Sequence, residues 1–74
     1  MKKIYLFEFY VILQDGSWTL KDNIRFSLYD KRKKLADLKR KGYIYDRIEK
    51  AYILKSDPFE SCYNYAVVIK SYEA

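Results

Sequence analysis

The hydrophobic pattern of the first residues is typical of a β-strand. Residues 4–14 are rich in aromatic and β-branched side chains, the types enriched in strands. The odd positions from Tyr5 to Leu13 are apolar without a break, and the even positions are interrupted only by Glu8 before Gln14 ends the run. Successive side chains of a strand point to opposite faces, so this strand would be apolar on both of them. Such a strand usually lies in the middle of a sheet.

Asp15-Gly16 follows directly and predicts a hairpin, because a type I′ turn needs positive φ at both central residues. A two-residue turn at 15–16 sets a register in which nearly every facing pair is apolar. These pairs are Leu13 with Trp18, Val11 with Leu20, Phe7 with Ile24 and Tyr5 with Phe26. Phe9 would face Asp22, so we expect a bulge at Asp22-Asn23.

Residues 28–41 are good helix formers. Ser27 fits the N-cap, with Asp30 three residues on, and Gly42 fits the position that ends a helix. The apolar stripe is thin and consists of Leu28, Leu35 and Leu38, with Ala36 at its margin. We therefore expect the helix to pack one narrow edge on a sheet. Leu35 and Leu38 would be buried, whereas Lys33, Asp37 and Arg40 would be exposed.

The remaining pattern predicts two more strands. Residues 43–47 are a connection and residues 48–55 a third strand, with a helix over 46–54 as the alternative. Residues 56–61 form a loop around Pro58, and residues 63–72 a fourth strand with Tyr63, Tyr65, Val67 and Ile69 on one face. The predicted fold is α+β with the order ββαββ: a four-stranded, mainly antiparallel sheet with one helix packed on one face. Residues 1–74 would be a single small domain.

The positive charge is concentrated on the predicted helix. The chain has a net charge of +5, and residues 31–41 hold seven bases and one acid, which is +6. The other residues hold eight bases and nine acids, which is −1. This helix is either a solvated face that keeps the protein soluble or a site for nucleic acid or an acidic protein patch. The candidate residues are Lys33, Lys34, Arg40 and Lys41.

A second candidate surface is the sheet face that the helix cannot cover. It would carry Ile4, Leu6, Tyr10 and Ile12, beside Thr19, Lys21 and Arg25 of the next strand. Four large apolar residues are too many to leave in water on so small a domain. We therefore expect a protein partner or a homodimer at this face.

The residue inventory argues against catalysis. The chain has no histidine, one cysteine and two glycines, so it lacks the side chains for a zinc site, a nucleophile–base pair or a phosphate-binding loop. We expect no enzyme activity, no catalytic residue, no metal, no cofactor and no small-molecule substrate. Cys62 would be a small buried or half-buried filler near the loop. A lone cysteine and the lack of an apolar run of about 20 residues favour the cytoplasm and no membrane association.

Size, aromatic strands and the missing catalytic side chains are typical of small accessory proteins of phages, viruses and mobile elements. We therefore expect a regulator or inhibitor that binds a host protein or nucleic-acid-handling complex through the aromatic sheet face and the basic helix. The alternative is a sequence-nonspecific nucleic-acid-binding module that uses helix 28–41. The salt dependence of binding distinguishes the two functions, because phosphate contacts weaken steeply as the salt concentration rises and apolar contacts do not.

Overall fold

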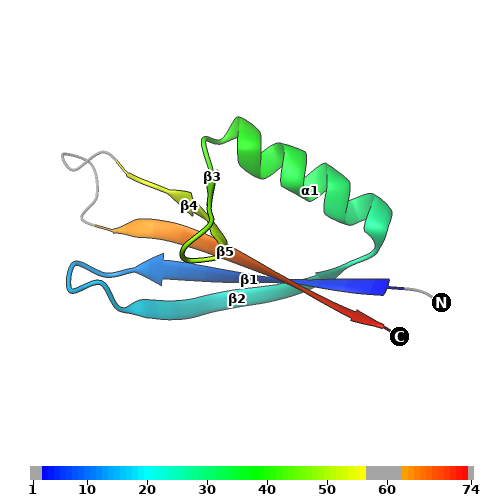
Figure 1. Cartoon of the computed structure of the whole chain (residues 1–74), viewed down its shortest axis with the longest axis horizontal. Helices are drawn as coiled ribbons and strands as arrows, with labels where there is room; N and C mark the ends of the chain where they lie inside the picture. Colours follow the sequence, from blue (N-terminus) through cyan, green and yellow to red (C-terminus); the bar gives the residue numbers. More distant parts are fainter. Residues whose placement is uncertain (1–2, 57–62, 74) are drawn as a thin grey trace.

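The computed structural model describes residues 3–56 and 63–73, which form five strands and one helix (Figure 1). The elements are β1 (Lys3–Ile12), β2 (Trp18–Phe26), α1 (Leu28–Arg40), β3 (Ile44–Asp46), β4 (Ala51–Leu54) and β5 (Asn64–Glu73). All strands belong to one sheet in the order β2-β1-β5-β4-β3, and all neighbours are antiparallel. The α+β class is confirmed, whereas the prediction of four strands is wrong. The predicted loop beyond Ser56 and Cys62 lie outside the described residues.

The extra strand arises from residues 43–55, which form a hairpin rather than a connection and one strand. Asp46 Oδ1 accepts hydrogen bonds from the backbone N–H of Ile48 at 2.8 Å and of Glu49 at 3.1 Å. Lys50 then adopts a left-handed conformation with φ 55°. The Asp46 side chain thus closes a turn, as Asp does in many turns. The strand predicted over 48–55 therefore begins three residues late, and the alternative helix over 46–54 does not form.

The loop between β1 and β2 has three residues, not two. Leu13 N–H donates to the carbonyl oxygen of Ser17 at 2.8 Å, and Gly16 N–H donates to the carbonyl oxygen of Leu13 at 3.0 Å. Gly16 has φ 87°, so this is the common three-residue hairpin loop that ends with a left-handed glycine. Asp15 supports it by accepting hydrogen bonds from the Ser17 N–H and hydroxyl at 2.9 and 2.6 Å.

The longer loop shifts the first part of the hairpin by one residue. Ile12 faces Trp18 and Tyr10 faces Leu20, so the predicted pairs Leu13–Trp18 and Val11–Leu20 are wrong. The register then shifts between Phe9 and Tyr10, where Lys21 is the extra residue of β2. Beyond this bulge the predicted pairs of Phe7 with Ile24 and Tyr5 with Phe26 are confirmed. The bulge lies next to the predicted position and cancels the extra loop residue.

The core lies between α1 and one face of the sheet (Figure 1). Phe7 of β1, Leu38 of α1 and Val67 of β5 are its buried centre. Six half-buried side chains pack around them: Tyr5, Phe9, Phe26, Tyr43, Tyr52 and Ile69. The odd positions of β1 and β5 therefore face the helix, as the alternation predicts.

Both ends of α1 are capped as predicted. The Ser27 hydroxyl oxygen accepts a hydrogen bond from the Asp30 N–H at 3.3 Å. At the other end Gly42 has φ 105°, and its N–H and that of Tyr43 donate to the carbonyl oxygens of Lys39 and Leu38, both at 3.1 Å. This pair of bonds is a Schellman motif, which needs the left-handed conformation that glycine adopts without strain.

Only part of the predicted apolar stripe of α1 meets the sheet. Leu38 is buried as predicted and Leu35 is half-buried, but Leu28 is 45% exposed. Two lysines complete the face instead. Lys31 Nζ lies 4.5 Å from the centre of the Tyr5 ring, and Lys34 Nζ lies 5.7 Å from that of Phe9. The alkyl stems of such lysines cover apolar surface while the ammonium groups reach water.

Candidate functional site

The face of the sheet opposite α1 carries an apolar row that crosses all five strands. The register places Leu20, Tyr10, Ala66, Ile53 and Ile44 side by side, one from each strand in sheet order. Leu20 is 46% and Ile44 75% exposed at the two ends of the row, and Ala66 is buried in its middle. We call this side of the sheet the open face, because none of the described elements lies over it (Figure 1).

The one-residue shift of the hairpin adds a large aromatic side chain to the open face. Trp18 stands opposite Ile12, and its ring lies 5.5 Å from that of Tyr10. Sequence reasoning placed Trp18 and Leu20 on the helix side and Thr19 and Lys21 on the open face. The structure places Trp18 and Leu20 on the open face and Thr19, opposite Val11, on the helix side, so the open face near the loop is more apolar than predicted.

The four residues predicted for partner binding lie together on the open face. Ile4, Leu6, Tyr10 and Ile12 occupy even positions of β1, and all four are half-buried. Leu6 and Ile4 line a shallow hollow of about 420 Å³ with Arg25 of β2 and Tyr72 of β5. An apolar side chain with a nearby acceptor fits this hollow, because Arg25 offers up to five donors beside apolar walls.

An ion pair interrupts the apolar surface at the position of Glu8. Lys70 Nζ lies 3.2 Å from Glu8 Oε1, and the Tyr10 hydroxyl donates to the same oxygen at 3.2 Å. The hydrogen bond and charge of Glu8 raise the pKa of the Lys70 ammonium. Burial, followed by the Glu8 carboxylate, raises the pKa of the Tyr10 hydroxyl. The carboxylate therefore meets two donors from its own chain and does not require a partner.

The predicted basic residues of α1 do not form one row towards solvent. Lys34, Arg40 and Lys41 converge on Asp37, with nitrogen–oxygen distances of 3.7, 3.9 and 3.2 Å. A hydrogen bond from Lys41, helped by the charges of Lys41, Lys34 and Arg40, holds the pKa of the Asp37 carboxyl below its usual range. Lys33 Nζ lies 4.5 Å from the centre of the Tyr29 ring. The Asp37 carboxylate thus neutralises part of the positive charge that the helix could present to an anion.

Arg32 and Lys39 of α1 are more available to an anion than the predicted residues Lys34, Arg40 and Lys41. Arg32 and Lys39 are exposed, and neither has an ion pair or a ring contact within the part of the chain that the structure describes. Helical spacing explains why Lys34 is less available, since Lys31 and Lys34 share a face with Leu35 and Leu38. No pattern in the sequence singles out Arg32 and Lys39.

No helix within residues 3–56 and 63–73 is long and apolar enough to cross a bilayer. Comparison with protein-family models, curated proteins and solved structures finds no match to this chain. Function is therefore inferred from the two surfaces described above.

Proposed function

We propose that this chain is a small non-enzymatic binding protein, a regulator or inhibitor that acts by binding a larger protein or nucleic-acid-handling complex. The open face binds a protein surface of the partner, and the basic helix speeds association with it. The observation that carries the proposal is the apolar row across five strands on the side of the sheet opposite α1. Apolar patches of this extent on small proteins mark interaction sites.

The residue composition of the open face also supports protein binding. Tyrosine and tryptophan combine large contact area with few rotatable bonds, and they are enriched where protein partners meet. Tyr10, Trp18 and Tyr72 lie on the open face. The Glu8–Lys70 pair is satisfied within the chain, so burying it does not leave an isolated charge, the costly situation at an interface.

The test uses two leucines of nearly equal exposure on opposite sides of the molecule. Leu20 on the open face is 46% exposed and Leu28 on α1 is 45% exposed. We expect Leu20→Glu to abolish capture of the partner from nuclease-treated extract of the source cells, with an unchanged circular dichroism spectrum. The matched Leu28→Glu variant should capture the partner like wild type. Equal capture by all three proteins would contradict the role of the open face.

The second candidate function is sequence-nonspecific nucleic-acid binding by α1. It is favoured by the exposed Arg32 and Lys39. Residues 31–41 also carry a charge of +6, which exceeds the net charge of +5 of the whole chain. Binding of a labelled duplex should then weaken in the Arg32→Ala, Lys39→Ala double variant, and it should be lost when Lys33, Lys34, Arg40 and Lys41 are replaced by alanine as well. Each lost phosphate contact should also reduce the salt slope by about one unit. If a protein is the partner, the same variant mainly slows association.

A further inference from the structure

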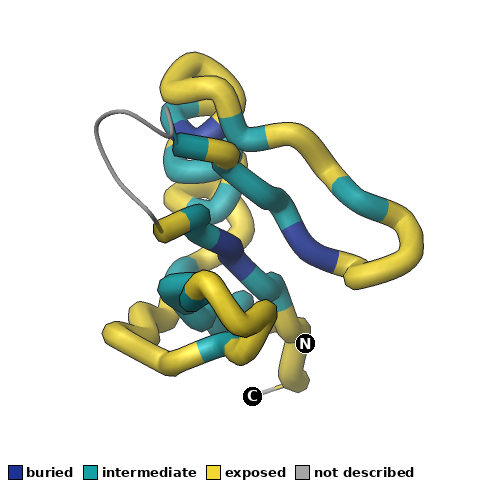
Figure 2. Tube along the Cα trace, turned by 90° about the vertical axis from the view of Figure 1, so that its left-hand side faces the viewer, coloured by how far each residue is buried: buried dark blue, intermediate teal, exposed yellow. Residues whose placement is uncertain are grey.

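The β3–β4 hairpin presents an isoleucine almost entirely to water. Ile48 is 91% exposed at the turn between the two strands. Figure 2 shows this hairpin as a largely exposed loop that stands off from the body of the chain. Turns normally hold Gly, Pro, Asn, Asp or Ser, so a large apolar side chain at this position is unexpected for a purely connecting segment.

The turn also holds Ile48 in a defined place. The two hydrogen bonds that Asp46 Oδ1 accepts from the backbone of Ile48 and Glu49 fix the start of the turn. Lys50 in the left-handed conformation fixes its end. The backbone of such a turn is ordered before it binds, which lowers the entropy lost on association.

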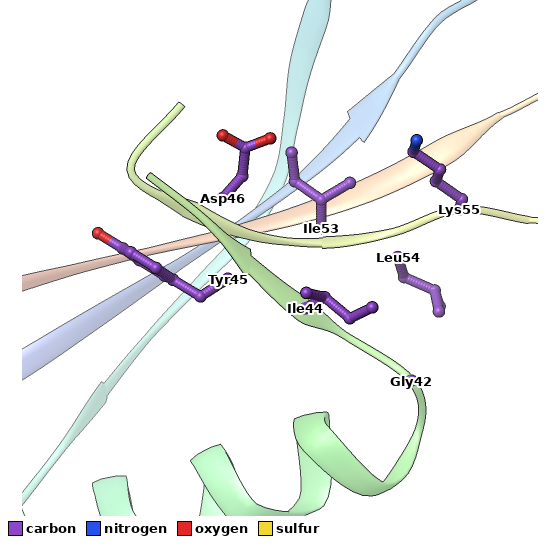
Figure 3. A pocket seen from close by; sticks show the side chains of 7 residues that line it. All are labelled: Gly42, Ile44, Tyr45, Asp46, Ile53, Leu54 and Lys55. Atoms are coloured by element: carbon purple, nitrogen blue, oxygen red, sulfur yellow. The ribbon is translucent and has the colours of Figure 1, made fainter. Parts of the chain in front are cut away.

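A hollow lies on the same hairpin. It measures about 400 Å³ and is lined by Ile44, Tyr45, Asp46 and Ile53, together with Gly42, Leu54 and Lys55. Figure 3 shows the Ile53 side chain between the carboxylate of Asp46 and the ammonium group of Lys55. Asp46 uses only Oδ1 in the turn, so its second oxygen is available to another group.

The turn and the hollow are complementary in charge. The turn offers a base, an isoleucine and an acid in the order Arg47, Ile48, Glu49. The hollow offers an acid, an isoleucine and a base in the order Asp46, Ile53, Lys55. Arg47 and Glu49 have no ion pair among the described residues. Turn and hollow belong to one hairpin, so a two-fold axis would let each copy insert its turn into the hollow of the other.

We propose that the β3–β4 hairpin is a self-association site in which Ile48 of one copy enters the hollow of a second copy. Arg47 then faces Asp46 of the second copy, and Glu49 faces its Lys55. The turn holds two bases and two acids between Asp46 and Lys50, so it has no net charge to attract an anionic membrane. The hollow contains Ile44 and Ile53, one end of the apolar row on the open face, whereas Leu20 lies at the other end of that row. Variants of Ile48 and Leu20 therefore test this proposal and the proposed function separately.

The test is sedimentation velocity of the whole chain at rising concentration, up to about 1 mM because small interfaces give weak complexes. Wild type should change from the 9.0 kDa monomer to twice that mass. Ile48→Glu should stay monomeric with an unchanged circular dichroism spectrum, because the side chain is 91% exposed. Leu20→Glu should associate like wild type. Monomeric wild type, or loss of association in Leu20→Glu but not in Ile48→Glu, would overturn the proposal.

A charge exchange tests the orientation. Glu49→Lys and Lys55→Glu should each weaken the dimer about five- to tenfold, since a symmetric interface contains each pair twice. The double variant restores opposite charges and should return to within about twofold of wild type. A double variant weaker than either single variant would show that Glu49 and Lys55 do not meet across the interface.

Discussion

Some residues of this chain have structural roles that their residue type does not predict. Lys31 and Lys34 lie on the face of α1 that packs on the sheet, where their ammonium groups approach the rings of Tyr5 and Phe9. Leu28, which has the more suitable side chain, is largely exposed. Two of the seven bases that give the helix its charge are therefore also part of its packing.

Glu8 lies in a cluster whose contribution to stability depends on pH. It raises the pKa of Lys70 and contributes to the raised pKa of Tyr10. Both groups hold their protons more tightly in the folded chain than in the unfolded chain. The stability from this cluster is therefore fully present below the ordinary pKa values of 10.0 and 10.5 and is lost as the pH rises through the higher folded values.

Glu8→Gln tests this linkage. We expect wild type to melt at a higher temperature than the variant at neutral pH, and the difference to shrink in strongly alkaline buffer as the cluster loses its protons. The measurement is the melting temperature by circular dichroism across the alkaline range. Glu73→Gln, at an exposed position at the end of β5, is the control and should follow wild type. Curves for wild type and Glu8→Gln that stay parallel would contradict the linkage.

At the scale of elements, the β1–β2 hairpin depends on the backbone conformation of Gly16. Gly16→Val should destabilise the fold by about 1 kcal/mol or more, because a β-branched residue resists positive φ. An added Cβ meets nothing within 4 Å, so the cost is conformational. Gly16→Asn should cost less, since Asn tolerates the left-handed region. Chemical denaturation measures both variants, and equal losses would show that steric contact sets the cost.

The register next to the same loop could not be predicted from the sequence. Asp15-Gly16 suits a two-residue turn and also a three-residue loop, because both place Gly16 at positive φ. The bulge at Lys21 cancels the difference, so Phe7 and Tyr5 keep the same partners in either case. Alternation along the chain therefore predicts the far half of the hairpin, but it cannot decide which face Trp18 occupies near the loop.

The candidate surfaces were predictable to the extent that they are local. Alternate residues of β1 identify the open face from the sequence alone. The contributions of Ile53 and Ile44 depend on strand order, and distant strand pairing leaves no local pattern. The β3–β4 turn had one local signal, the side chain of Asp46, which can accept backbone hydrogen bonds as Asp commonly does in turns. The β-strand composition around it concealed that signal.

At the scale of the whole molecule, stability depends on one thin core layer. Phe7, Leu38 and Val67 form its buried cluster, and Leu38 is the residue of α1 that is fully enclosed. Leu38→Ala should cost about 2–4 kcal/mol, a large part of the roughly 4–11 kcal/mol expected for a chain of this size. Leu28→Ala should cost less than about 0.5 kcal/mol. Urea denaturation distinguishes them, and similar losses would mean that the helix packs on another face.

The open face, which none of the elements in residues 3–56 and 63–73 covers, affects how the protein responds to heat. A chain of this length absorbs only about 50 kcal/mol on melting near 60 °C, with a heat-capacity increase near 1 kcal/mol/K. A fold with few enclosed side chains exposes less new apolar surface on melting, so its calorimetric peak should be low and wide. A polypeptide that binds the folded chain alone shifts that equilibrium by mass action. The temperature range over which this protein remains folded is therefore set partly by the concentration of whatever it binds.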